Sequence, residues 1–573
     1  MKKKTLFLLL TFLLFGFITI TAQVNEDSSE VDLSINSHLS EYVAPSIFSV
    51  SGDAGAYGEL YSTSRDVKRR PGATGRLFLR PTFTFLNNFS ISFDLFVSTE
   101  GSDARQQINR FALHPSWSWG RAHIGDFSHK FSDYSLNGVS IRGGGVEINP
   151  GWFRFELLAG QTKRAVVGGY YSSVYSQYLA GAKIGVGKKG GSFFDLNVVL
   201  AKDDSNSVPK STFIIDTNAI GGNPQVGITP QENLLIGFNT DLKIIKNILR
   251  LRGEATASLF TRDTYAEKAD VNGVPTFLTN IFPLRYSSNA DFAYKGILDF
   301  RYGFFNTSLK YQVVNPGFYS LGMTSVINDK RKYGVRMGFR LFNNRLMLNL
   351  RYDGQNDNLL NQKRYTLSRK TMGANITIRP IRSLAIMFNG LLNNMGNNTS
   401  NDTLKIDSKV SSFGTNVSYQ FRAFSTRNAL TVGYSYQLSE NYNFYLRNKG
   451  NGKVTVNNIF ANLNTTLNST WSFAPGFTAI MVDSWLGTSN KTYTFSFRIN
   501  GRFMRSRWNN SLTMSLANSD YTNVTQVNFQ SNFRLTKSDM IRVKIRYALT
   551  DYIKGPLENF WENIASLNYV HRL

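Results

Sequence analysis

The chain contains no cysteine, little proline and no long apolar run beyond its first residues. Without cysteine, neither a disulfide framework nor a lipid-modified N-terminal cysteine is possible. The longest apolar stretch, residues 6–20, is shorter than the roughly 20 residues that a spanning helix needs. Helical periodicity is not sustained anywhere, and the 14 prolines in 573 residues permit long strands. These absences favour an all-β chain.

The N-terminus has the pattern of a secretory signal peptide. Three lysines at positions 2–4 precede the apolar run, and two small residues stand before Gln23. We therefore expect export of the protein, removal of residues 1–22, and a short acidic N-terminal segment at residues 23–47.

Basic residues outnumber acidic ones by 64 to 39. Removing the three signal lysines leaves 61 against 39, a formal charge of about +22. Export argues against nucleic acid as a partner, and the basic residues stand singly instead of in runs. The anionic neighbours that we expect are lipopolysaccharide phosphates, anionic solutes or an acidic protein segment.

Residues 79–98, LRPTFTFLNNFSISFDLFVS, alternate between apolar odd-numbered and polar even-numbered positions. A strand sends successive side chains to opposite faces, so the stretch predicts a hairpin with one apolar and one polar face. A turn at residues 86–88 keeps apolar side chains opposite each other. The predicted pairs are Phe85–Phe89, Phe83–Ile91 and Arg80–Asp94.

The same test predicts the register at four further turns. Each register keeps apolar opposite apolar across the turn, which is the condition for a shared face. The predicted pairs are Ile148–Phe153, Val146–Phe155 and Glu147–Arg154 across Pro150-Gly151; Ile244–Leu249, Leu242–Leu251 and Asp241–Arg252 across Lys246-Asn247; Leu341–Leu346, Phe339–Leu348 and Arg336–Arg351 across Asn343-Asn344; and Phe533–Val543 and Arg534–Arg542 across loop 536–540.

Short and long connections alternate along the chain. Short turns are expected near residues 87, 120, 150, 189, 246, 304, 343, 381, 425, 469, 504 and 538. A soluble sandwich, the alternative, would scatter its loops over both ends, whereas outer-membrane barrels have short periplasmic turns and long extracellular loops. We predict a closed antiparallel transmembrane β-barrel over residues 48–573, with about 26 strands (about 22 to 28). Its 44 Phe suit an apolar outer band, and its 27 Tyr and seven Trp suit interfacial girdles.

A barrel of this width is too wide to be left open, since 22-stranded transporters already have a plugged lumen. We expect loops 203–232 and 261–288 to fold inward. The N-terminal segment is a second candidate plug, because its acidic residues are opposite in sign to the wall; its composition equally fits a disordered tail. These acidic residues are Glu26, Asp27, Glu30 and Asp32.

Many basic residues share the inward parity under these registers. They are Arg80, Arg154, Arg250, Arg252, Arg336, Arg340, Arg351, Arg534, Arg542, Lys544 and Arg546. Some face acids and others face like charge, which costs stability across a ladder. Two interpretations stay open: the lumen binds an anionic occupant, or its arginines bond to loop carboxylates and wall carbonyls.

Four potential metal ligands fall within sixteen residues: His114, His123, Asp126 and His129. A zinc site would need the next strand to aim His123 or Asp126 at His114 with ligand distances of about 2.0–2.2 Å. We predict no metal and no other cofactor. Catalysis is not predicted either, because only four histidines exist besides His571.

Three consecutive glycines, residues 143–145, do not precede a helical pattern, so they do not predict a phosphate-binding loop. A bulge is the expected explanation, and a strand packed against an inserted loop is the alternative.

Several segments resemble large outer-membrane barrels of the Bacteroidota. They are SGDAGAYGELYS (51–62), RRPGATGRLFLRPTFTF (69–85), INRFALHPSWSWGRAHIGD (108–126), GGGVEINPGWFRFELLAGQTKRAV (143–166) and VVNPGFYSLG (313–322). Residues 109–166 are also similar to part of the type IX secretion translocon barrel. The resemblance implies location and fold, because the family has no settled activity.

Two functions remain in competition. The first is a pore for anionic or glycan-like solutes, whose basic lumen concentrates anions. The second is a non-catalytic partner in protein secretion or cell-surface assembly. A TonB-dependent receptor would need a plug domain of over a hundred residues, roughly four times what precedes the barrel. Expected contacts are outer-membrane lipid, lipopolysaccharide, possible secretion-system proteins and the barrel-assembly machinery, for which Leu567, Tyr569 and Leu573 keep the spacing of a signal.

Overall fold

The computed structural model divides the chain into two units, Met1–Pro45 and Ser46–Leu573. The residues that it describes are 47–101, 106, 108–167, 173–188, 190–208, 228–270, 276–442, 445–446, 452–554 and 557–573. The predicted signal peptide and the acidic residues Glu26, Asp27, Glu30 and Asp32 lie outside this range.

The second unit is built almost wholly from 26 strands. Within the described residues, two short helices, α2 (Thr276–Ile281) and η3 (Asp402–Leu404), lie in the loops. No helix in the described part of the chain is long and apolar enough to cross a bilayer. The strands are β1 (Phe48–Thr63), β2 (Ala73–Phe85), β3 (Phe89–Ser98), β4 (Arg110–Trp117), β5 (Gly120–Ser128), β6 (Ser140–Ile148), β7 (Phe153–Lys163), β8 (Ser176–Gly187), β9 (Phe193–Asp204), β10 (Glu232–Ile245), β11 (Leu249–Thr261), β12 (Ser288–Tyr302), β13 (Phe305–Val314), β14 (Lys330–Leu341), β15 (Leu346–Asn356), β16 (Leu367–Ile381), β17 (Leu384–Asn397), β18 (Asp407–Ala423), β19 (Thr426–Asn441), β20 (Val454–Thr466), β21 (Trp471–Ser484), β22 (Ser489–Phe503), β23 (Trp508–Ser519), β24 (Thr522–Arg534), β25 (Asp539–Tyr552) and β26 (Phe560–Arg572).

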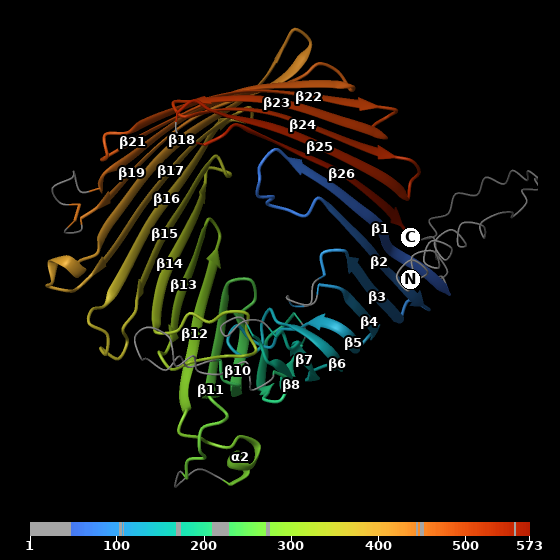
Figure 1. Ribbon diagram of the computed structural model, residues 1–573, viewed down its shortest axis with the longest axis vertical. Coiled ribbons are helices and arrows are strands. Elements are labelled where there is room, and N and C mark those ends of the chain that lie inside the picture. Colours follow the sequence, from blue (N-terminus) through green and yellow to red (C-terminus); the bar gives the residue numbers. More distant parts are fainter. Residues whose placement is uncertain are drawn as a thin grey trace, which may run out of the picture. The chain divides into compact units, whose positions relative to one another are not determined.

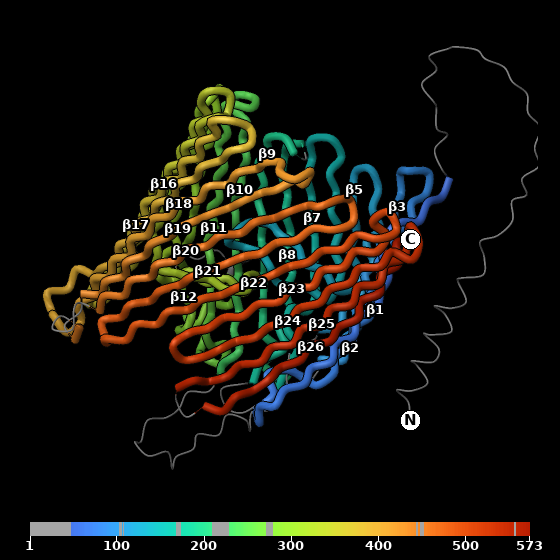
Figure 2. The backbone as a smooth tube through the Cα atoms, turned by 90° about the horizontal axis from the view of Figure 1, so that it is seen from above, coloured from blue at the N-terminus to red at the C-terminus, as the bar shows by residue number. Residues whose placement is uncertain are grey.

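The sheet closes on itself. Each strand pairs antiparallel with its neighbours in the chain, and β1 pairs with β26 from Asp53↔Arg572 to Thr63↔Glu562. Figure 1 shows the resulting ring, and Figure 2 shows the later strands running side by side across it. Closure satisfies the backbone groups that an open sheet edge would leave unpaired. The predicted closed antiparallel barrel with 26 strands is confirmed.

All twelve short turns lie where the alternation places them, from the turn between β2 and β3 to the turn between β24 and β25. The predicted register at the first turn is confirmed for Phe85↔Phe89 and Phe83↔Ile91. At Asn343-Asn344 all three predicted pairs are confirmed, including Arg336↔Arg351. Both asparagines adopt positive φ, 54° and 65°, which asparagine tolerates well.

Two predicted registers are wrong, and a third is wrong at one of its three pairs. Ile148 pairs with Phe155 instead of Phe153, and Phe533 pairs with Ile541 instead of Val543. Both errors are shifts of two residues, which preserve the facing of every side chain and so escape a test based on alternation. Between β10 and β11 a bulge makes Ile245 the partner of Leu249, although Leu242↔Leu251 and Asp241↔Arg252 are as predicted.

The two faces of the sheet differ in chemistry. On β8 and β9 the apolar outer side chains are about half exposed, as at Ile184 (52%) and Leu196 (56%). Their neighbours of opposite parity, Lys183 (5%) and Asp195 (1%), are polar and covered. A closed sheet has one inner and one outer face, and loop segments inside the ring cover the polar one (Figure 1). The polar face is therefore the inner face.

Tryptophan gathers at the two rims. Five of the seven lie at the short-turn end: Trp117, Trp119, Trp152, Trp471 and Trp508. The other two, Trp485 and Trp561, lie at the long-loop end. Two aromatic girdles bounding an apolar band are typical of a barrel that meets lipid.

Two segments fold onto the inner face. Residues 129–139 and 315–329, here called the inserted segments, supply Phe131, Tyr134, Leu136 and Phe318 to the main buried cluster. Ser320 Oγ donates to the carbonyl of Ser135 over 3.0 Å, which joins the two segments. A buried core thus lies against the inner face of the wall between β5 and β13.

The inserted segments are not the loops that we expected. Figure 1 places α2, in loop 261–288, outside the ring of strands, so this part of that loop does not fold inward. Residues 209–227 of the other expected loop lie outside the described residues.

The three glycines form no bulge. The ladders of β6 with β5 and with β7 run without a register shift from residue 142 to residue 148. A Cβ on Gly143 would lie 2.0 Å from the carbonyl oxygen of Ala159, and a Cβ on Gly145 would press on Leu158. Close packing against β7 explains these two glycines, so neither the expected bulge nor packing against an inserted loop accounts for them.

Candidate functional site

The inner face is the candidate functional site, because the predicted basic residues lie there. Alternation along the observed registers puts all of them on the polar face: Arg80, Arg154, Arg250, Arg252, Arg336, Arg340, Arg351, Arg534, Arg542, Lys544 and Arg546. Nine of these eleven residues fall into two groups by their surroundings.

The first group is neutralised by carboxylates. Arg80 Nη2 lies 2.9 Å from Asp53 Oδ2, and Arg252 Nη2 lies 2.6 Å from Asp299 Oδ2. Arg250 forms an ion pair with Asp241. The partners predicted from sequence were Asp94 for Arg80 and Asp241 for Arg252, and both were wrong as ion pairs. Side chains reach diagonally along the sheet, so ladder register alone does not choose the partner.

Arg154 is the first of several buried charged side chains that form linked ion pairs on β7, β8 and β9. Its guanidinium donates two hydrogen bonds to Asp195, of 2.8 and 3.0 Å. Lys183 Nζ lies 3.9 Å from Asp195 Oδ2 and 2.6 Å from Glu156 Oε1. The predicted pairing of Arg154 with Glu147 is wrong, because Glu147 faces Glu156 in the ladder. The inserted segment 129–139 covers these side chains and desolvates them.

The second group lies on β14, β15 and β25 and has no carboxylate partners in the described part of the chain. Arg336 and Arg351 face each other across β14 and β15. Arg542, Lys544 and Arg546 follow one another on the inner face of β25. Within the described residues, none of these five forms an ion pair with a carboxylate, and Arg542 Nε instead donates to Asn532 Oδ1 over 2.7 Å.

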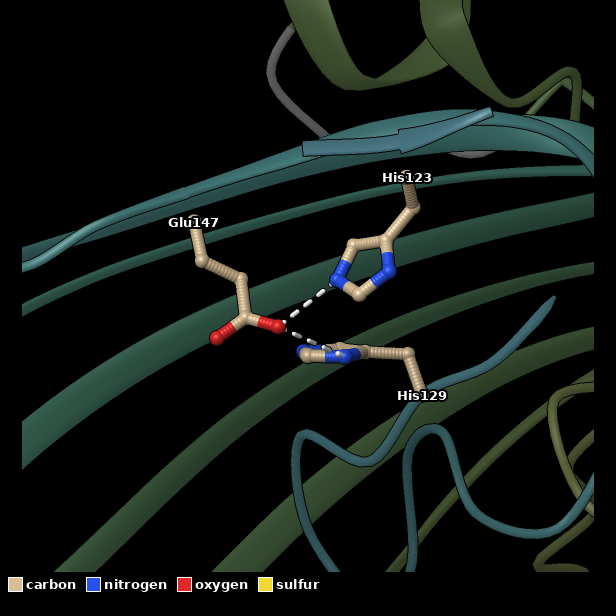
Figure 3. A group of neighbouring side chains, drawn as sticks. All are labelled: His123, His129 and Glu147. Atoms are coloured by element: carbon tan, nitrogen blue, oxygen red, sulfur yellow. Dashed lines mark hydrogen bonds and ion pairs between the residues drawn. The ribbon is translucent and has the colours of Figure 1, made fainter. Parts of the chain in front are cut away.

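A histidine cluster lies where β4, β5 and β6 meet the first inserted segment. His123 Nδ1 lies 3.0 Å from His114 Nδ1, and His123 Nε2 lies 2.8 Å from Glu147 Oε1. His129, the first residue after β5, has its Nδ1 3.6 Å from the same carboxylate oxygen. Figure 3 shows the two imidazoles converging on Glu147.

The sequence-based view of these histidines needs correction. The two-residue turn after Trp117 places His123 against His114. This contact is one that a zinc site would require and that we did not predict. Because His114 and His123 lie at equal distances from that turn along the chain, the sequence could have indicated this contact. Asp126 does not join them, because Arg142 binds it through Nε and Nη2. Glu147 was missed as a partner because it comes from a third strand.

A cavity of about 540 Å³ opens on the inner face beside the cluster. Its lining includes His114, His123, Arg121 and Asp94. The Oδ1 atom of Asp94 is buried there without a hydrogen-bond partner. A buried carboxylate oxygen of this kind is costly unless water or a cation satisfies it.

Comparisons with known proteins give distant architectural likeness and no family. No family model matches the chain, and no curated protein sequence matches it. The solved structures that resemble it include the P pilus usher PapC translocation pore, with 11% identity, 91% of this chain and 100% of that chain covered, and a TM-score of 0.38.

Two porins are further examples. The outer-membrane protein OpdK from Pseudomonas aeruginosa shows 8% identity over 60% of this chain and 94% of its own, with a TM-score of 0.30. The anion-selective porin from Comamonas acidovorans shows 8% identity over 46% of this chain and 93% of its own, with a TM-score of 0.26. These values are too low to carry an argument about the function of this chain.

Proposed function

We propose that the protein is an outer-membrane channel without catalytic activity, whose lumen favours anionic or glycan-like solutes. The observation that carries the proposal is the asymmetric inner face. Charges on β7 to β12 neutralise one another in ion pairs, whereas the basic residues of β14, β15 and β25 lack carboxylate partners among the described residues. An uncompensated basic wall raises the local concentration of anions.

The outer face supports a membrane location. Its apolar side chains form a band between two tryptophan-bearing rims, and the closed ladder satisfies the backbone groups that hydrocarbon could not. With an even strand number both ends of the barrel unit lie at the short-turn rim, which is periplasmic in barrels of this kind.

The test is the reversal potential of the purified protein in a planar bilayer under a KCl gradient. We expect a steady current with a potential that reports preference for chloride. The triple variant Arg542→Gln, Lys544→Gln, Arg546→Gln should shift the potential toward that of a nonselective pore. The matched control is Arg252→Gln with Asp299→Asn, which removes a neutral pair from the same face and should leave selectivity nearly unchanged.

A cation-selective current, or a triple variant with unchanged selectivity, would contradict the anion proposal. A closed trace together with co-purifying secretion components would instead favour the second candidate, a barrel partner in protein secretion or cell-surface assembly of the type IX kind.

A further inference from the structure

Three ligand atoms converge from three places in the chain. His123 lies on β5, Glu147 on β6, and His129 at the start of the inserted segment 129–139. One ligand atom from each lies within 4.8 Å of the others. Their side chains are 9%, 17% and 14% exposed, so they face each other largely out of water (Figure 3).

The hydrogen bond that His129 makes outside this centre leaves two acceptor atoms facing each other inside it. His129 Nε2 lies 2.7 Å from Glu156 Oε2, so this nitrogen carries the proton and donates it to the carboxylate. The Nδ1 of a neutral His129 then presents a lone pair to Glu147 Oε1 at 3.6 Å. Two acceptors that face each other in a shielded site need a cation between them, either a second proton on His129 or a metal ion.

The surrounding groups suit a metal. The Glu156 contact reproduces the carboxylate–histidine–metal arrangement that orients a ligand imidazole, and Lys183 in turn holds Glu156. On the other side, His114 Nδ1 lies 3.0 Å from His123 Nδ1, so one of these two nitrogens donates a hydrogen bond to the other. When His123 Nδ1 is the donor, its Nε2 has a lone pair that can coordinate a metal in place of the 2.8 Å contact with Glu147 Oε1.

The charge near the centre is also compatible with a divalent ion. Glu147, Glu156 and Asp195 are acidic, and Lys183 and Arg154 compensate for two of them. Arg121 lies opposite Glu147 in the ladder and forms no ion pair with it within the described residues. Asp94, whose Oδ1 has no hydrogen-bond partner among the described residues, lines the adjoining cavity together with His123, so the cavity borders the centre.

We propose that His123, His129 and Glu147 bind one divalent transition-metal ion, and that this ion ties the inserted segment 129–139 to the barrel wall. Two imidazole nitrogens and one carboxylate oxygen suit Zn²⁺, and three protein ligands leave a position for water or a solute. The site does not depend on the channel proposal, because it is formed by the wall and one segment alone.

The experiment uses the full protein in detergent, stripped with a chelator and then dialysed against Zn²⁺. We expect about one zinc ion per chain by elemental analysis, as three convergent ligands imply. Glu147→Gln and His129→Asn should each lose most of this zinc. His571→Gln is the matched control, because His571 bonds to Asp539 far from the site, and it should bind as the parent does.

Two further readouts keep the test decisive if a variant folds poorly. Co²⁺ in the parent protein should give the visible absorption of a nitrogen- and oxygen-ligated ion, and Zn²⁺ should slow amide exchange over residues 130–139. Zinc content equal in the parent and in folded Glu147→Gln protein would overturn the site. Unchanged amide exchange on zinc binding would overturn its role in holding the segment.

Discussion

Lys183 Nζ lies 2.6 Å from Glu156 Oε1, and both side chains are nearly inaccessible to solvent, at 5% and 6% exposure. The pair joins β8 to β7 beneath Phe131 of the inserted segment, whose ring lies 5.3 Å from the ammonium group. Compared with apolar residues of similar volume, a buried ion pair of this kind adds little to the stability of the fold. Removing only one partner is costly, because the other charge then stays buried without its counter-ion.

Lys183→Met should therefore destabilise the barrel by about 3–5 kcal/mol. Glu156→Leu added to it should recover part of that loss, because it removes a buried carboxylate that would keep only His129 as a partner among the described residues. The measurement is the unfolding temperature in detergent, followed by heat-modifiable gel mobility, for both single variants and the double variant. Strict additivity of the two single effects would contradict the coupling that the geometry requires.

Gly143→Ala should disrupt the pairing of β6 with β7. Its Cβ would lie 2.0 Å from the carbonyl oxygen of Ala159 and 2.6 Å from the Cα of Gly160, so backbone would have to move. Gly144→Ala is the control on the same strand, since its Cβ meets nothing closer than 3.7 Å. We expect loss of folded yield for the first variant only; equal yields for the two would show that β6 adapts without cost.

Val198→Arg should impair insertion into lipid vesicles. Val198 lies in the middle of β9 on the outer face and is 43% exposed. A cation near the bilayer midplane costs about 2–4 kcal/mol in barrels of this class. Ser515→Arg, in β23 on the inner face, provides a matched cation in water. Normal insertion of the Val198 variant would argue against lipid contact at this face.

Asp329 fixes the end of the second inserted segment to loop 357–366. Burial alone would raise the pKa of Asp329, but hydrogen bonds from Lys363 and from the backbone N–H of Leu359 outweigh it and hold the pKa below its usual range. The hydrogen bond to Asp329 in turn raises the pKa of Lys363.

The signs of these shifts define a pH window. The Asp329 contribution is present above its unfolded pKa, about 3.9, and is lost as pH falls through the lower folded value. The Lys363 contribution is present below about 10.4 and is lost as pH rises through the higher folded value. Between these limits the contact should be independent of pH.

A spin label tests this window. Because the chain has no cysteine, Ile327→Cys offers one attachment point, and Ile327 is 66% exposed within the inserted segment. The mobility of the label should not depend on pH around neutrality, and it should increase when the pH falls below about 4. With Asp329→Asn added, mobility should be high already at neutral pH. An acid transition that survives this second substitution would assign the transition to another group.

Much of the fold is readable from local pattern. Alternation with a period of two marks strands, and the spacing of asparagine and glycine between them marks the turns. These signals sufficed for the strand number, all twelve short turns and the pairing of Arg336 with Arg351. They also identified which basic residues share a face, because the facing of a side chain depends only on its parity.

The partners of those residues were not readable from pattern. A shift of two residues keeps every side chain on its face, so alternation could not exclude pairing Ile148 with Phe153 or Glu147 with Arg154. Ion pairing is decided by diagonal reach, and the inner face of β9 supplied Asp195 to Arg154 from 41 residues away.

By itself, the sequence determined a closed barrel with an apolar outside and a polar inside, since both properties are periodic along each strand. Only the tertiary structure decided where residues 129–139 and 315–329 fold, and therefore which charges are neutralised and which histidines meet. Such contacts join segments up to 185 residues apart, as at Ser135 and Ser320, and no local periodicity encodes them.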